Sequence, residues 1–167
     1  MLRAAILWVL SAFAVQAATC ETLTYKDASY TVCDTTPTTD TLRLFLNDAD
    51  GEPFGYFSAV NEMLEAEGET LSFAMNAGMY HDNRAPVGHY VENGTEMMRV
   101  IPNAGPGNFG LLPNGVFCIR EDRADVIETL RFVKDAPACR FASQSGPMLV
   151  IDGEVHPRFL PDGTSRY

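Results

Sequence analysis

The sequence predicts an α+β domain that is dominated by mixed β-sheet and has one clear helix. Short segments in which apolar and polar residues alternate recur along the chain. Gly, Pro, Asn and Asp separate them, which is typical of strands and turns. One stretch instead repeats its apolar residues at helical spacing. Because 46% of the 167 residues are hydrophobic, a single domain can bury a substantial core.

Residues 1–17 have the pattern of a secretory signal peptide, so we place the folded domain at residues 18–167. Arg3 supplies the positive start, residues 4–15 are almost entirely apolar, and small residues near the end offer a cleavage site. A transmembrane anchor would need about 20 apolar residues. A lipoprotein anchored at Cys20 is disfavoured by the residues before it. We therefore expect a secreted or periplasmic protein with no membrane anchor after cleavage.

Four cysteines follow the signal segment, an even number that suits an oxidising compartment. Three pairings exist, and we favour Cys20–Cys33 with Cys118–Cys139 because each pair brackets a hairpin-like segment. Closing a loop of this size contributes roughly 3 kcal/mol. The alternative is a metal site, which no Cys/His spacing supports, so we expect no metal.

The predicted strands begin with a hairpin, in which residues 22–25 and 30–32 alternate around a turn at residues 26–29. A third alternating segment covers residues 42–46. The later strands are expected at residues 71–75, 87–91, 97–101, 116–120, 126–130 and 148–151. Asn93-Gly94 gives the strongest hairpin signal, between the second and third of these later strands.

The predicted helix lies between the third and fourth strands. Ser58 can cap its first turn, and Val60, Met63 and Leu64 form an apolar stripe. Gly68 can end it, since glycine readily adopts the left-handed conformation that follows many helices.

Charge excludes one class of partner. The formal net charge is −10, from 12 Lys and Arg against 22 Asp and Glu. Binding to a polyanion depends on clustered Lys and Arg, so we expect no nucleic-acid partner. The oligomeric state is left open.

The loops between the predicted strands are rich in Gly, Asn, His and Ser, which suits a cleft for a polar ligand. Glycine at a strand end allows a ligand or another backbone to approach closely. The alternative is that these loops are only tight turns. Familiar catalytic motifs are missing: there is no G-x-S-x-G, H-E-x-x-H, G-x-G-x-x-G or P-loop. A serine nucleophile at Ser145 is the weaker alternative.

Five motifs occur in a specific order: AMNAGMY at 74–80, PVG at 86–88, GNF at 107–109, PNGVF at 113–117 and QSGPMLV at 144–150. Together they resemble the phosphodiester glycosidase domain family, relatives of the lysosomal "uncovering enzyme", which removes N-acetylglucosamine from a sugar phosphodiester. The bacterial exported branch is the more similar one. The resemblance covers about residues 25–167. Family domains continue with an Arg-bearing strand and an Asp-Gly-Gly-Gly-Ser type motif, so we expect that this chain lacks the C-terminal part of the domain.

The resemblance implies an exported hydrolase that cleaves a sugar-1-phosphodiester, whether small or polymeric, and we expect no cofactor. The alternatives are a carbohydrate- or envelope-polymer-binding domain without catalysis, an inactive fragment, or a structural envelope protein.

Residue roles follow from the resemblance together with the loop chemistry. We expect Asp82, His81 and Arg158 to be catalytic, although the two-carboxylate template of glycosidases is not filled. Cationic and amide groups would bind the phosphate and the sugar hydroxyls. The expected substrate-binding residues are Asn76, Gly78, Arg84, Gly88, Asn108, Asn114, Gln144, Ser145, Gly146, His156 and Arg166.

Overall fold

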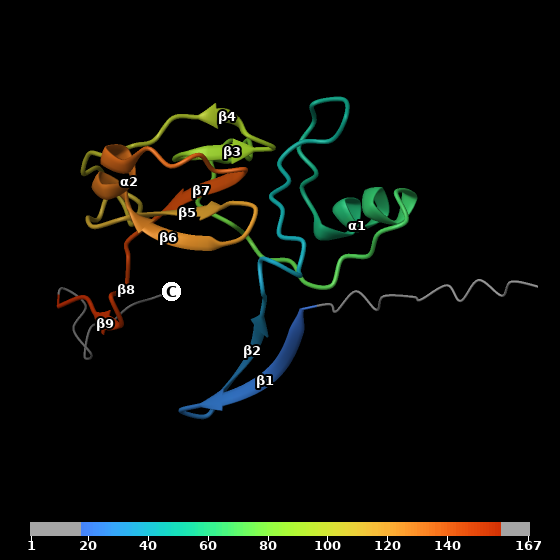
Figure 1. The fold of residues 1–167 in the computed structure, drawn as a ribbon, viewed down its shortest axis with the longest axis horizontal. Coiled ribbons are helices and arrows are strands. Elements are labelled where there is room, and N and C mark those ends of the chain that lie inside the picture. The colour runs from blue at the N-terminus through green and yellow to red at the C-terminus, as the bar shows by residue number, and fades with distance from the viewer. Residues whose placement is uncertain (1–17, 158–167) are drawn as a thin grey trace, which may run out of the picture.

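The centre of the fold is a five-stranded antiparallel sheet with the strand order β4-β3-β7-β5-β6 (Figure 1). The structure is a computed structural model that describes residues 18–157. The predictions made for residues 1–17, Arg158 and Arg166 lie outside these residues. The sheet strands are β3 (Tyr90–Glu92), β4 (Thr95–Met98), β5 (Gly115–Ile119), β6 (Ala124–Glu128) and β7 (Phe141–Ser145). The predicted sheet-dominated α+β class is confirmed.

The hydrophobic core lies between helix α2 (Thr129–Asp135) and strands β3, β5 and β7. The side chain of Phe132 reaches from this helix into the core and is 7% exposed. Burying a side chain of this size contributes roughly 1.5–3 kcal/mol. The buried core cluster consists of Val91, Val116, Cys118, Phe132 and Ala142.

Both predicted disulfides are confirmed. Cys118 on β5 is bonded to Cys139 in the segment between α2 and β7, so this bridge lies at the edge of the core. Cys20 and Cys33 lie directly opposite each other on β1 (Thr19–Tyr25) and β2 (Ala28–Asp34). This hairpin projects away from the sheet, and almost all of its residues are exposed (Figure 1). The two disulfides therefore stabilise different parts of the molecule.

The helix predicted after the third strand is confirmed as α1 (Phe57–Ala66), which buries Val60 and Leu64. Its predicted cap is wrong, because the N-cap position is Tyr56, which makes no side-chain capping bond, and Ser58 lies inside the first turn. In Figure 1, α1 lies to one side of the central sheet and is joined to it by irregular segments.

The predicted strand at residues 42–46 does not form. The N–H of Leu46 donates instead to the carboxylate of Glu92 on β3, at 3.1 Å. The hydroxyl of Tyr90 donates to the same oxygen at 2.9 Å. Burial, with a contribution from Glu92, raises the pKa of Tyr90, which keeps this hydroxyl a donor. The carboxylate of Glu92 thus accepts the backbone hydrogen bond that a neighbouring strand would otherwise accept.

The predicted strand at residues 71–75 does not form either. The N–H of Leu71 donates to the side-chain oxygen of Asn61 on α1, at 3.2 Å. Asn61 in turn donates to Glu65 one helical turn further on, at 2.6 Å. The segment is therefore attached to the helix instead of to a sheet.

Strand β7 is the middle strand of the central sheet, yet alternation does not predict it, and its residues lie between the strands predicted at 126–130 and 148–151. Its residues from Phe141 to Gln144 are all buried. It pairs with β5 along its whole length and with β3 at two positions. A strand that neighbours cover on both faces shows no apolar–polar alternation, which explains the miss.

Helix α2 was also missed, since residues 126–130 were predicted to be a single strand. Strand β6 ends at Glu128, whose carboxylate accepts a hydrogen bond from the N–H of Arg131 at 3.0 Å and so caps the helix. Ala136 ends it in the left-handed conformation, with a φ of 41°. Strand and helix follow each other directly, without a loop.

The hairpin predicted at Asn93-Gly94 is confirmed between β3 and β4. Both residues have positive φ, 49° and 77°, as a type I′ turn requires. The prediction for 148–151 is confirmed in part, since β8 (Val150–Ile151) pairs with the unpredicted β9 (Glu154–Val155).

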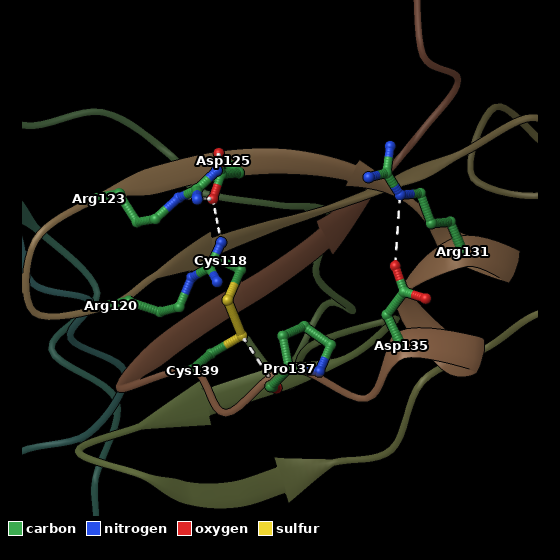
Figure 2. A network of polar contacts seen from close by, with 8 residues as sticks. All are labelled: Cys118, Arg120, Arg123, Asp125, Arg131, Asp135, Pro137 and Cys139. Carbon is green, nitrogen blue, oxygen red and sulfur yellow. Dashed lines mark hydrogen bonds and ion pairs between the residues drawn. A yellow bond between two sulfur atoms is a disulfide. The ribbon is translucent and has the colours of Figure 1, made fainter.

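An ion-pair cluster closes the β5–β6 hairpin (Figure 2). Arg123 donates to both carboxylate oxygens of Asp125, at 2.7 and 2.8 Å, and Arg120 also donates to this carboxylate. The hydrogen bond from Arg123, and then the one from Arg120, hold the pKa of Asp125 below its usual value. The ionised form of Asp125 therefore contributes to the stability of this hairpin.

We expect the two disulfides to contribute unequally to stability. Replacing Cys118 and Cys139 together with Ala should lower the free energy of unfolding by about 3 kcal/mol, through loop entropy. Replacing Cys20 and Cys33 should change it much less, because the hairpin is exposed. Urea unfolding followed by far-UV circular dichroism measures both. Equal losses would show that the hairpin unfolds together with the core.

We expect Asp125 to make stability depend on pH. Its folded-state pKa is lowered, so its contribution is present above the unfolded value of about 4 and is lost as the pH falls through the folded value. The loss should be about 1 kcal/mol or less, because the pair is close to solvent. In the Asp125→Asn variant, the midpoint of urea unfolding should change less with pH between about pH 5 and pH 2 than in wild type, measured at constant ionic strength. An unchanged acid slope would contradict this.

Candidate active site

A short hairpin loop at residues 79–87 carries the polar side chains that the structure groups together. The N–H of Val87 donates to the carbonyl of Met79 at 3.0 Å, and the N–H of His81 donates to the carbonyl of Ala85 at 2.9 Å. These hydrogen bonds hold the base of the loop, so that its tip projects from a fixed frame.

The tip is a tight turn with one strained residue. The N–H of Arg84 donates to the carbonyl of His81 at 2.8 Å, and Asn83 accepts from the N–H of Ala85 at 3.1 Å. Arg84 has a φ of 68°, in the left-handed region where Gly or Asn is usual. This conformation costs an ordinary residue about 1–2 kcal/mol. An arginine at this position therefore carries a local energetic cost.

The turn borders an open depression of about 500 Å³, lined by Tyr80, His81, Asp82 and Asn83. All four residues are exposed. The guanidinium of Arg84 lies over the ring of Tyr80, 5.1 Å from its centroid. The structure thus brings three of the predicted site residues, His81, Asp82 and Arg84, onto one turn.

These three side chains have complementary chemistry. The imidazole of His81 can give or take a proton, and the carboxylate of Asp82 can accept one. The guanidinium of Arg84 carries a permanent charge and N–H donors that match phosphate oxygens. Asp82 is the one carboxylate among the described residues that line the depression. The arrangement can therefore bind an anion beside a proton acceptor.

The predicted site glycines lie elsewhere, where loops pack tightly together. A Cβ added at Gly146 would lie 2.5 Å from the Cβ of Asn114, and one at Gly88 would lie 2.5 Å from the ring of Phe109. Gly78 approaches β7 in the same way. At these three glycines the missing side chain therefore makes room for another part of the chain.

Gln144 is 1% exposed and lies at the centre of this packing. Its side-chain oxygen accepts from the N–H groups of His89 and Ile101, both at 3.0 Å. Its amide nitrogen donates to the carbonyl of Ile101 at 2.8 Å and to the hydroxyl of Thr129 at 3.1 Å, and lies 3.5 Å from Asn114 Oδ1. These bonds use the full hydrogen-bonding capacity of an amide.

Asn114 is fully buried beside Gln144. Its side-chain nitrogen donates to the carbonyl of Phe109 at 3.0 Å. Its own carbonyl accepts from both the N–H and the hydroxyl of Thr129 at 3.0 Å, which fixes the start of α2. Two of the four predicted substrate-binding amides, Asn114 and Gln144, are thus engaged in hydrogen bonds inside the protein.

The other predicted residues within 18–157 do not line the depression. Asn76 is exposed at the start of the segment that leads to the loop, while Asn108, Ser145 and His156 are half-buried in separate segments. His156 follows β9, and its N–H donates to the carbonyl of Leu149 at 2.9 Å.

Three notable residues were missed by the sequence reasoning. Tyr80 and Asn83 line the depression, and their place in the same loop as His81 was the available signal. His89 is 5% exposed; its Nδ1 lies 3.0 Å from the carbonyl of Met98 and 3.5 Å from a Glu96 oxygen. His89 lies in the strand predicted at residues 87–91, whose apolar residues give no indication of this polar contact.

Across residues 18–157, no three His, Cys, Asp or Glu residues gather closely enough to hold a metal ion. Within the same residues, no helix combines the length and the apolar character needed to span a bilayer.

The comparisons with known proteins agree with the motifs. The sequence profile of the phosphodiester glycosidase family matches residues 69–166, which include the whole 79–87 loop. The chain is 35% identical over 163 residues to the uncharacterized protein YigE of Escherichia coli (strain K12). The match covers 95% of this chain and 61% of that relative, so the chain spans about three-fifths of the relative's length. No solved structure matches.

We expect Gln144 to be a determinant of stability. Gln144→Leu would leave the N–H groups of His89 and Ile101 and the carbonyl of Ile101 without partners, at about 1–3 kcal/mol each. The free energy of unfolding should fall by about 3 kcal/mol or more, measured by urea unfolding. The exposed-amide control Asn76→Ala should stay within about 0.5 kcal/mol of wild type. A Gln144→Leu protein of wild-type stability would contradict this role.

Proposed function

Because the chain belongs to the phosphodiester glycosidase family, we propose that it hydrolyses the bond between the anomeric carbon of a sugar and a phosphate oxygen of a phosphodiester. The single observation that carries the proposal is the grouping of His81, Asp82 and Arg84 on one turn beside an open depression, within the matched residues. Because the sugar and the alcohol on the phosphate are unidentified, the proposal names the bond and not the compound.

The reaction needs positive charge more than a strong acid. Water adds its oxygen to the anomeric carbon, the bond from that carbon to the phosphate oxygen breaks, and the electron pair leaves with a phosphate monoester. This leaving group is already a stable anion. Arg84, with His81 beside it, would stabilise the charge on the phosphate. Asp82 would accept the proton that the attacking water loses.

A site that binds an anion must be locally cationic on a protein whose net charge is −10. An acidic protein repels an anionic substrate at long range, so binding requires cations close to the phosphate. Arg84 meets this requirement on the turn beside the depression, where its guanidinium lies over the ring of Tyr80. Arg158, Arg166 and His156 are proposed as further phosphate ligands, and Asn76 and Asn108 as partners of sugar hydroxyls.

We also propose that the protein acts after export, in the periplasm or outside the cell. Its two disulfides support this, because such bonds persist mainly in oxidising compartments. The signal pattern at residues 1–17 supports it independently.

A second candidate function is carbohydrate phosphodiester binding without turnover. It is favoured by the single carboxylate among the described residues that line the depression, since most glycosidases use two. Calorimetry that shows ligand binding with no released sugar would favour this alternative.

We expect the purified chain to release free sugar from a sugar-1-phosphodiester, measured by a reducing-sugar assay. Asp82→Asn and His81→Ala should each lower kcat/KM by about 100-fold or more, the usual range for loss of proton transfer. Asp27→Asn is a matched control, because it changes an exposed turn carboxylate on the β1–β2 hairpin. Turnover that is unchanged in both site variants would refute the roles, and an absence of turnover in wild type would refute the function.

A further inference from the structure

The aromatic ring beneath the guanidinium of Arg84 belongs to Tyr80. Tyr80 is 46% exposed, lines the depression, and lies under the guanidinium of Arg84 at 5.1 Å. Tyr80 also pairs with Pro86 across the base of the loop. The backbone that carries the ring is therefore part of the frame of the loop, whereas Arg84 lies in the turn at its tip.

The described residues offer Arg84 no ion pair, because no carboxylate lies within 4 Å of its guanidinium. The stacked cation Arg43 differs, since it lies over Phe45 but is also neutralised by Glu69. Within residues 18–157, the guanidinium of Arg84 thus lies over a ring that lines the depression and has no carboxylate partner.

A cation–π contact suits the capture of an anion. A ring contacts the flat face of a guanidinium and leaves the N–H donors around its edge available. An arginine loses about 2 kcal/mol of rotamer entropy when it is fixed, and a side chain that is already held loses less of it on binding. A phosphate would thus meet donors that are already oriented.

We propose that Tyr80 is a positioning residue that holds the Arg84 guanidinium at the edge of the depression for a phosphate group. The inference rests on the proposed function, in which Arg84 contacts the phosphate. Tyr80 acts through Arg84 and not on the reacting atoms. Its aromatic ring is the required feature, and its hydroxyl is dispensable.

Titration with inorganic phosphate, followed by calorimetry at low salt, tests the inference in a double-mutant cycle. Tyr80→Leu should weaken binding roughly two- to fivefold, the effect of an exposed cation–π contact. Tyr80→Phe should keep wild-type affinity. In an Arg84→Gly background, Tyr80→Leu should have no further effect, and glycine fits the φ of 68° at that position.

Tyr25→Leu is the matched control, because it removes an exposed ring under a cation, Lys26, on the distant β1–β2 hairpin. It should leave phosphate affinity unchanged. Circular dichroism melting of every variant separates loss of the contact from loss of the fold.

The outcomes separate this inference from the proposed function. Equal affinity of Tyr80→Leu and wild type would overturn the inference, as would equal losses with and without Arg84, or no phosphate binding by wild type. Phosphate binding that follows the predicted cycle, without sugar release from a phosphodiester, would refute the hydrolase and support the positioning role.

Discussion

The hydrogen-bonded amide of Gln144 is the interaction on which the rest of the structure depends. It joins His89, which directly precedes β3, Ile101 in the segment after β4, and Thr129 at the start of α2. These segments are far apart in the sequence, and each presents backbone or hydroxyl groups that are costly to bury unpaired. One side chain on the middle strand satisfies them together and so fixes how the loops meet.

The close approach of those loops explains why glycine stands at the motif positions. Gly88 lies where a side chain would strike Phe109 and the Gln144 amide, and Gly146 lies against Asn114. The ordered motifs therefore encode in large part the packing around a buried polar centre. The reactive side chains lie at the adjacent turn, where His81, Asp82 and Arg84 are exposed.

A rigid base under an exposed turn is a suitable arrangement for binding a charged ligand. The frame of the 79–87 loop is held by its own ladder of hydrogen bonds, while its tip keeps Arg84 in a strained conformation over Tyr80. Strain of about 1–2 kcal/mol can persist only where the surrounding contacts determine the backbone. The packed loops thus allow a cation to be presented on an otherwise acidic protein.

The sequence by itself determined the features that depend on near neighbours: the α+β class, the Asn93-Gly94 hairpin, helix α1, and a disulfide pairing in which each bridge closes a short loop. It also pointed to His81, Asp82 and Arg84 through their shared loop. Only the tertiary structure decided that β7 is the middle strand, that residues 42–46 form none, and that Gln144 is a buried centre. The physical reason is that the hydrogen-bond partners of those residues come from distant parts of the chain, and no local pattern records them.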